Sequence, residues 1–486
     1  MEMRRTLIRG AAIVSMDLAI GDLPRGDILI EGNRIVGVAP VIEVGDAETV
    51  DAEGMIASPG FVDTHRHVWQ TQLKGVAIDW SLFDYICLMR SMYSVCYTPE
   101  DAYLGNYFGT LDAINAGVTS IVDHSHLQIT PEHSDALAKG MLDSGIRGVF
   151  CYGAYRNPKY MPGDLLTPEA IINDIAGPLE DFHRRNAPRV REKYFPSNDG
   201  LVRFGIASSE FPTAALAEPM LEELAWARTL DPAVISMHAG VGVNEHFRMV
   251  PILHEHGQLG NDLLFVHGAH LTDEDLVLLR DHGGWLSTTP ETELQMGMGY
   301  PVLERVAASG STPSLGIDIA SNFAGDMFAQ MRLMLQAMRF RHFEHANAGL
   351  PAASRYAARK MLEFATIGGA TVMGLETITG SLTPGKRADI ILTRTDSVHM
   401  SPVFDPVAAL VFYADAADVD SVWIDGIARK RGGRLVGVDW PAGHAALSAS
   451  RDAIYAKFGQ ISEREIRATW APLWGLETRA MDPADA

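Results

Sequence analysis

The chain has 486 residues, of which 47% are hydrophobic and 21% are charged, and its formal net charge is −21. Such a composition is typical of a globular protein with a sizeable core. The negative charge argues against nucleic acid or an anionic membrane as a partner, because both attract Lys and Arg rather than Asp and Glu.

The three cysteines, Cys87, Cys96 and Cys151, form no CxxC pair. A disulfide framework is therefore not expected, and a reducing cytoplasm suits the chain. No apolar run reaches the ~18 residues that are needed to cross a bilayer. We expect a soluble, cytoplasmic protein.

The two ends of the chain resemble each other in pattern. Residues 1–58 contain short apolar strands, with a hairpin signal at Gly32-Asn33. Similar strands occur at 388–393 and 422–427. We predict one small β-sandwich domain built from residues 1–58 and 376–440.

The middle, residues 59–375, alternates short apolar strands with amphipathic helices, which predicts a (β/α)8 TIM-like barrel. A doubly wound open sheet is the alternative. The tail, 441–486, is predicted to be a helical extension that packs onto the barrel. The eight predicted strands are Ile56–Val62, Thr119–Asp123, Gly148–Tyr152, Val202–Ala207, Val234–His238, Leu263–His267, Trp285–Thr288 and Ser314–Asp318.

Two histidines, His65 and His67, follow the first of these strands. Alternate side chains of a strand point to the same side, so both imidazoles leave the strand end together. Paired imidazoles at a strand end can chelate a divalent metal. Two solvated loop histidines are the simpler interpretation of this spacing alone.

Three more strands end in a polar group: His238, His267 and Asp318. The C-terminal ends of barrel strands form one rim, where catalytic groups gather. Imidazoles with a carboxylate suit Zn²⁺, Fe²⁺ or Mn²⁺ and leave a position open for water, whose pKa the metal lowers towards ~7. A carboxylate can then take the proton of this water, and a further imidazole can stabilise developing negative charge. Taken singly, each histidine could also be a satisfied core residue.

Three segments carry a resemblance to a known family. Pro59-Gly60-Phe61-Val62-Asp63-Thr64-His65-Arg66-His67 is the first, residues 316–322 are the second, and residues 368–389 are the third. They resemble the amidohydrolase superfamily, in the branch of guanine and cytosine deaminases and triazine chlorohydrolases. The second segment departs from the family pattern, with Ile317 in place of Thr and one spacer residue fewer before Ser-Asn.

The resemblance implies that His65, His67, His238 and Asp318 bind one divalent metal, with Zn favoured over Fe or Mn. It further implies that Asp318 is the general base and that His267 polarises the substrate. The fourth strand offers no lysine, so a two-metal site bridged by a carboxylated lysine is not expected.

The chain also departs from the deaminases of this branch. They carry a Glu three residues after the histidine of the fifth strand, as general acid and base, whereas this chain has Val241. Glu245 and Glu210 are candidate replacements, and a solvated Glu245 at the start of the next helix is the simpler alternative.

Residues that bind substrate are expected in the loops at the rim. Glu291, with Glu293 and Gln295 beside it, lies in a βα loop that could decide specificity or could be a solvated turn. His126 follows the second strand, and Trp69 follows the first, where a helix-core role is the alternative. The substrate-binding set is therefore Trp69, His126, Glu210, Glu291 and His267. Lys74 and Arg156 are the rim cations that the sequence suggests, so a polyanionic substrate is not expected.

We therefore expect a metal-dependent amidohydrolase that hydrolyses a C–N bond of a small cyclic or aromatic nitrogen compound, with deamination favoured. Opening of a cyclic amide and dechlorination are alternatives on the same site. A metal-dependent lyase or isomerase and a non-catalytic oligomeric scaffold are alternatives of other classes. The expected partner is a small-molecule substrate, and we expect a homo-oligomer, a dimer or a tetramer.

Overall fold

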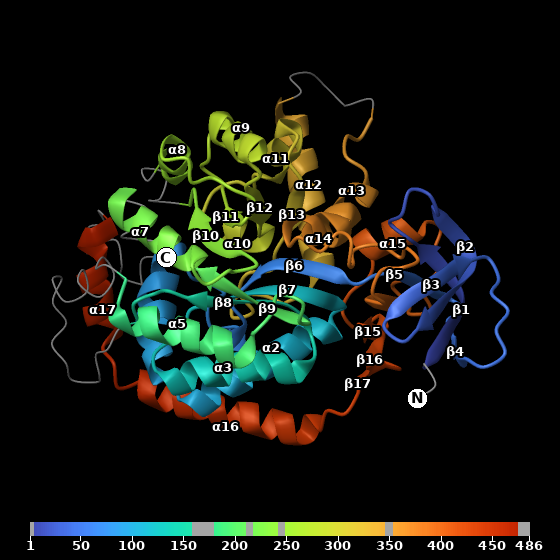
Figure 1. Cartoon of the computed structure of the whole chain (residues 1–486), viewed down its shortest axis with the longest axis horizontal. Coiled ribbons are helices and arrows are strands. Elements are labelled where there is room, and N and C mark those ends of the chain that lie inside the picture. The colour runs from blue at the N-terminus through green and yellow to red at the C-terminus, as the bar shows by residue number, and fades with distance from the viewer. Residues whose placement is uncertain (1–3, 158–178, 210–216, 242–247, 346–352, 475–486) are drawn as a thin grey trace.

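The computed structural model describes residues 4–157, 179–209, 217–241, 248–345 and 353–474. Within these residues the strands form two separate sheets, one of eight strands and one of nine. Figure 1 shows the eight-stranded sheet surrounded by helices and the nine-stranded sheet beside it, with both early and late strands of the chain in the second sheet.

The eight-stranded sheet is parallel, and its order follows the chain. Nearly every residue of these strands is buried, as expected of a parallel sheet covered by helices. The strands are β6 (Phe61–Arg66), β7 (Val118–Ser125), β8 (Arg147–Gly153), β9 (Val202–Ala207), β10 (Ile235–Ala239), β11 (Leu263–His267), β12 (Trp285–Thr288) and β13 (Pro313–Leu315).

The first and last strands meet through an irregular contact that we call the closing seam, residues 65–67 and 316–318. The amides of Ile317 and Asp318 donate to the carbonyl of His65 at 3.1 and 2.8 Å, and the amide of His67 donates to the carbonyl of Asp318 at 2.8 Å. The eight strands thus form a nearly closed barrel, which confirms the predicted (β/α)8 fold.

The prediction of one strand over Ile56–Val62 is wrong. The chain changes sheets at Gly60: β5 (Met55–Pro59) pairs with β1 and β14 in the nine-stranded sheet, whereas β6 begins the barrel at Phe61. The amide of Gly60 donates to the carbonyl of Asp389 at 3.1 Å. Pro59-Gly60 interrupts the apolar segment at this point, and the apolar residues on both sides of it favoured a single strand.

The nine-stranded sheet is mixed and joins the two ends of the chain, in agreement with the predicted origin of the second β unit. Its order is β17-β16-β15-β14-β5-β1-β2-β3, and β4 pairs with β1. The strands are β1 (Arg5–Val14), β2 (Asp22–Glu31), β3 (Arg34–Ala39), β4 (Glu48–Asp51), β5, β14 (Ile390–Arg394), β15 (Val419–Ile424), β16 (Ile427–Arg431) and β17 (Arg434–Leu435).

Local sequence signals begin and end the helices around the barrel. For example, α9 begins after Thr272, which forms a capping box with Asp275, and ends at Gly283 in the left-handed conformation. In the described part of the chain, the α-helices of at least six residues are α2 (Pro99–Asn115), α3 (Pro131–Ser144), α5 (Asp181–Tyr194), α7 (Ala217–Arg228), α8 (Met249–Glu255), α9 (Asp273–His282), α10 (Pro290–Gln295), α11 (Leu303–Ser309), α12 (Met327–His345), α13 (Ala358–Glu363), α15 (Pro406–Phe412), α16 (Trp440–Phe458) and α17 (Glu463–Trp470).

The C-terminal helices return to the barrel. Helix α16 packs against α2 and the 3-10 helix η1 (Val68–Leu73), and α17 packs against η2 (Tyr85–Tyr93), a π-helix. In Figure 1, α16 runs along the outer side of α2 and α3. The proposed division into domains at residues 58, 375 and 440 stays a prediction.

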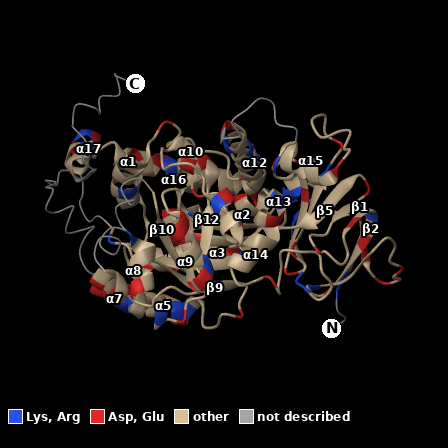
Figure 2. Ribbon diagram, turned by 90° about the horizontal axis from the view of Figure 1, so that it is seen from above, with Lys and Arg blue, Asp and Glu red and all other residues tan. Residues whose placement is uncertain are grey.

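Acidic and basic residues are spread over the outer helices and loops, as Figure 2 shows. Among the described residues, no helix combines the length and the apolar character that crossing a membrane would require.

We predict that Gly60→Ala destabilises the fold. A Cβ atom at this position would lie 2.1 Å from Cγ2 of Thr119, which is part of β7. Thr119 is β-branched and fully buried, so it cannot move aside without disturbing the barrel. We expect a loss of about 1–3 kcal/mol in the free energy of unfolding, measured by urea denaturation.

Gly45→Ala is the matched control, since a Cβ atom at Gly45 would meet nothing within 4 Å. Equal stability of the two variants would show that the change of sheets at Gly60 tolerates a side chain.

Candidate metal centre

The closing seam positions three of the predicted site residues. His65 and His67 alternate along the end of β6, and backbone hydrogen bonds tie them to Asp318. In the side chains, Nε2 of His65 and Nε2 of His67 each lie 3.3 Å from Oδ1 of Asp318. The bonds that close the barrel therefore also bring two imidazoles to one carboxylate oxygen.

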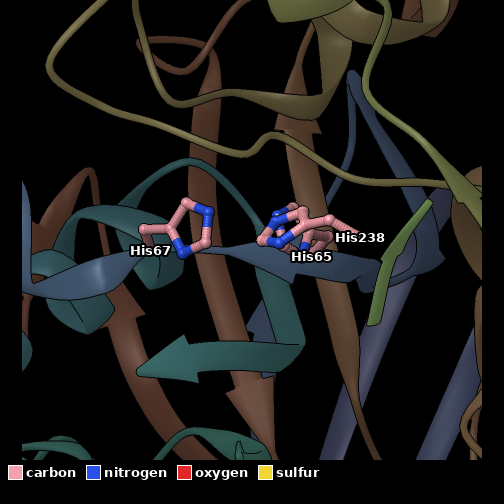
Figure 3. Close-up of side chains that lie close together, drawn as sticks. All are labelled: His65, His67 and His238. Atoms are coloured by element: carbon pink, nitrogen blue, oxygen red, sulfur yellow. The ribbon is translucent and has the colours of Figure 1, made fainter. Parts of the chain in front are cut away.

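His238 and His267 come from the neighbouring strands β10 and β11. Nε2 of His238 lies 3.2 Å from Nε2 of His65, and the rings of His238 and His267 stack with centroids 5.3 Å apart. Figure 3 shows the rings of His65 and His238 side by side, with the ring of His67 further along the same strand. The ligand atoms of His65, His67 and His238 all lie within 4.8 Å of one another, and so do those of His65, His267 and Asp318.

The backbone at the two strand ends is unusual. His267 has φ 74° and Asp318 has φ 75°, a region that residues other than glycine rarely adopt. Such conformations cluster at functional sites, where the surrounding structure holds them in place. Here they turn the side chains at the ends of β11 and of the closing seam towards the cluster.

Burial favours the neutral form of the imidazoles of His65 and His67. Burial, followed by the charges of His238 and His267, holds the pKa of His65 well below its usual value. Burial, with His65 as the next cause, does the same to the pKa of His67. Neutral imidazole is the form that binds a metal.

The distances also suit a metal ion. In a tetrahedral site with metal–ligand bonds of about 2.0–2.1 Å, neighbouring ligand atoms lie ~3.3 Å apart. The three contacts among His65, His67, His238 and Asp318 measure 3.2–3.3 Å. The close approach of the Nε2 atoms of His65 and His238 is explained by a shared cation, and the donor set of imidazoles and one carboxylate fits zinc, iron or manganese.

A second layer of groups orients these imidazoles. Nδ1 of His67 lies 2.8 Å from the carbonyl of His124, which fixes its proton on Nδ1 and leaves Nε2 for a ligand. The hydroxyl of Tyr155 lies 2.7 Å from Nε2 of His124 and 3.4 Å from Nδ1 of His238. The hydroxyl of Ser236 lies 2.9 Å from Nδ1 of His124.

His267 has its own support from Thr289, which precedes α10, and from Glu293 within α10. Its Nδ1 lies 2.9 Å from Oγ1 of Thr289 and 3.4 Å from Oε1 of Glu293. The backbone amide of Thr289 donates to the same Oε1 at 2.8 Å. Glu293 is fully buried, and burial raises its pKa.

An ion pair lies behind the seam. Oδ2 of Asp63 lies 2.9 Å from Nε of Arg66, and Oδ1 accepts hydrogen bonds from the amides of Ile317 and His65. Both side chains are buried. The other end of the guanidinium donates to the carbonyl of Gly325 at 2.8 Å. The pair thus links both sides of the closing seam.

The structure brings some of the predicted substrate-binding residues to this cluster and places others elsewhere. His126 stacks on His67 with centroids 4.0 Å apart. The ring of Trp69 instead packs against Tyr97, in the core beside α2. Glu291 is bonded to Gln330 of α12, and burial raises its pKa to about 7. Glu210 lies outside the described residues, as does Glu245.

The rim cations differ from the expectation. Lys74 is exposed and pairs with Asp112 of α2 at 2.9 Å, whereas Arg90, which the sequence did not suggest, stacks on Tyr155 with its Cζ 4.8 Å from the ring centroid. Thr289, Tyr155 and Arg90 are the residues that sequence reasoning missed. Thr289 and Tyr155 lie just after β12 and β8, a position that could have indicated them, whereas Arg90 lies in a helix.

Comparison with known proteins places this chain in a family. The sequence profile of the Amidohydrolase family matches residues 56–429. The chain belongs to the amidohydrolase family. The predicted resemblance is therefore confirmed, and the protein is a hydrolase that acts on C–N bonds other than peptide bonds.

Two curated relatives cover most of this amidohydrolase. The 5-methylthioadenosine/S-adenosylhomocysteine deaminase of Thermococcus kodakarensis is 28% identical over 414 residues, which are 83% of this chain and 89% of that protein. The 5'-deoxyadenosine deaminase of Methanothermobacter thermautotrophicus is 29% identical over 453 residues, which are 90% and 95% of the two chains.

Two solved structures share the fold of this amidohydrolase. An adenosine deaminase from Xanthomonas campestris with bound zinc has a TM-score of 0.78 at 21% identity, and covers 93% of this chain and 98% of its own. The triazine hydrolase of Arthrobacter aurescens has a TM-score of 0.79 at 23% identity, with 92% and 99% covered.

We predict that Arg66→Met strongly destabilises the amidohydrolase. The change leaves the carboxylate of Asp63 buried without its cation, which costs about 3–5 kcal/mol. The midpoint of urea unfolding, followed by circular dichroism, measures this loss. Arg280→Met, which removes an exposed pair with Asp281, is the control and should cost less than about 1 kcal/mol. Similar midpoints for both variants would contradict a role for the pair in holding the seam.

Proposed function

We propose that this amidohydrolase is a metal-dependent deaminase that removes the amino group of a small nitrogen heterocycle. One observation carries the proposal: the imidazoles of His65, His67 and His238 and the carboxylate of Asp318 converge with ligand atoms 3.2–3.3 Å apart. The names of the curated relatives, which are deaminases of adenosine derivatives, support the choice of an aminated heterocycle.

His65, His67, His238 and Asp318 are the proposed ligands of one divalent metal, with zinc favoured over iron or manganese. When bound, such an ion polarises a water molecule and lowers its pKa, so that hydroxide is available near neutral pH. The neutral state of the first two imidazoles suits this role.

Asp318 is the proposed general base. One oxygen, Oδ1, lies within 3.3 Å of two imidazoles, and a carboxylate has a second oxygen on which it can receive a proton from the attacking water. The left-handed backbone at this residue and the closing seam keep the carboxylate in place. The proton can then pass to the departing nitrogen.

His267 is the proposed group that stabilises developing charge on the substrate. Thr289 and Glu293 can both accept from its Nδ1, so the proton is held on Nδ1 and Nε2 carries the lone pair. If Nε2 gains a proton, the carboxylate of Glu293 stabilises the imidazolium, as a buried acid does behind a catalytic histidine. This pair offers proton transfer without a glutamate at position 241.

Val241 favours a second candidate, the opening of a cyclic amide. Its side chain is buried in the hydrophobic core, so this position supplies no proton for a ring nitrogen. Amide opening needs a proton on the leaving nitrogen alone, which Asp318 can deliver. The cytoplasmic location and the homo-oligomeric state, a dimer or a tetramer, stay predictions.

A panel of heterocycles tests the proposal. The zinc-loaded enzyme is incubated with aminopurines, aminopyrimidines and aminotriazines, and ammonia is measured with a coupled assay. We expect release of ammonia from at least one amine. Turnover of cyclic amides with no turnover of any amine would replace deamination by the second candidate, and incorporation of ¹⁸O from water would separate hydrolysis from a lyase or isomerase reaction.

We predict that Asp318→Asn lowers kcat/KM by about 100- to 10,000-fold, because it removes the general base. Metal content per chain, measured by plasma mass spectrometry after dialysis, should fall as well, since a neutral amide is a weaker ligand than a carboxylate. His254→Ala, at an exposed histidine of α8, is the control and should keep both activity and metal. Full activity of Asp318→Asn would contradict the assignment.

A further inference from the structure

A π-helix carries two side chains to the histidine cluster. The helix η2 has hydrogen bonds between residues five apart: the amide of Ser94 donates to the carbonyl of Met89. Residues five apart in such a helix lie on one side, and Tyr85 and Arg90 are such a pair. The ring of Tyr85 lies 6.4 Å from that of His67, and Cζ of Arg90 lies 4.8 Å from the ring of Tyr155.

Tyr155 places the guanidinium of Arg90 one side chain away from the proposed metal ligands. Its hydroxyl lies 3.4 Å from Nδ1 of His238, and its ring meets the ring of His126 edge-on at 4.8 Å. His126 in turn stacks on His67. After burial, the positive charge of Arg90 is the next cause that lowers the pKa of His126, which agrees with this proximity.

The guanidinium has no counter-ion in the part of the chain that the structure describes. Its Nη1 is buried and has no hydrogen-bond partner, and no described carboxylate lies within 4.0 Å of it. Arg90 as a whole is half-buried. The two arginines that are buried more deeply are paired, Arg66 with Asp63 at 2.9 Å and Arg147 with Asp389 at 2.6 Å, whereas the half-buried Arg203 donates to the carbonyl of Met373. A buried N–H group of a cation is normally compensated by an acceptor.

Stacking on Tyr155 does not supply this compensation. A ring face attracts the guanidinium from above, but the N–H groups donate in the guanidinium plane and need acceptors there. A planar carboxylate is the acceptor that matches two neighbouring N–H groups of a guanidinium, because its two oxygens can accept two parallel hydrogen bonds. A phosphate group is less suitable here, because the sequence contains no phosphate-binding glycine loop beside Arg90.

We propose that Arg90 binds a carboxylate of the substrate, and that this amidohydrolase prefers nitrogen heterocycles that carry such a group. The inference rests on the proposed function for the reacting centre and adds the substrate class. Arg90 acts on specificity: it holds the substrate in the ground state and in the transition state alike. Its loss should therefore raise KM more than it lowers kcat.

Matched substrate pairs test this role. Aminopyrimidines are offered either as the ring carboxylate or as the ring carboxamide, which has nearly the same shape and no charge. The variants are Arg90→Met and Arg90→Lys. The control is Arg341→Met, which removes an arginine that also stacks on a tyrosine, Tyr300, but on α12.

We expect the unaltered enzyme to have the higher kcat/KM for the carboxylate. Arg90→Met should lower kcat/KM for the carboxylate by about 10- to 100-fold, as expected for a charged hydrogen-bonded contact, and should change the value for the carboxamide less than about threefold. Arg90→Lys should keep part of the preference for the carboxylate, because lysine retains the positive charge but lacks the two parallel N–H donors of arginine. Arg341→Met should behave like the unaltered enzyme.

A binding experiment separates this inference from the proposed reaction. Calorimetry with pyridine-3-carboxylate and pyridine-3-carboxamide measures recognition without turnover. Binding of the carboxylate that Arg90→Met abolishes would support the role of Arg90 even if no amine is deaminated. Equal affinities for the two probes, an equal loss of both substrates in Arg90→Met, or a preference for a ring phosphate over the carboxylate would overturn it. If Arg90→Met does not fold, Arg90→Lys and Arg90→Gln decide by the same measurements.

Discussion

The site depends on the hydrogen bonds that close the barrel. The carbonyl of His65 accepts from the amide of Asp318, and the carbonyl of Asp318 accepts from the amide of His67. These contacts are made by the same residues whose side chains form the cluster, so the geometry of the cluster is fixed by backbone bonds and not by side-chain packing alone. The left-handed φ of Asp318 is the conformation that satisfies the seam and presents the carboxylate at once.

Burial then determines the chemistry of the cluster. Burial lowers the pKa values of His65 and His67, because a charged imidazole is unfavourable away from water. Neighbouring histidines lower these pKa values further, because like charges would repel. Burial also strengthens the Coulomb interactions of the remaining charges, because the dielectric constant is low there. The buried pair of Asp63 and Arg66 shows how such a charge is compensated within the chain, and Arg90 shows one for which the described chain supplies no anion.

Much of the fold and the centre of the site could be predicted from the sequence. Apolar segments that end in His or Asp indicate barrel strands and place those side chains at one rim, because parallel strands share their C-terminal edge. The exchange of sheets at Gly60 was not predicted, although Pro59-Gly60 breaks the run there: such a pair indicates an interruption but not that the two halves join different sheets. The position of Arg90 could not be predicted: a π-helix shifts the faces of a helix relative to an α-helix, and nothing in the segment Tyr85–Tyr93 indicates that shift.

Val241 and the support of His267 belong to one argument. A deaminase must protonate a ring nitrogen, and a buried valine removes the usual carboxylate from the end of β10. In this chain a buried carboxylate, Glu293, instead lies behind the histidine at the end of the next strand, 3.4 Å from Nδ1. A histidine backed by an acid can both accept and return a proton. In the proposed reaction the proton transfer therefore moves by one strand around the rim, from the end of β10 to the end of β11.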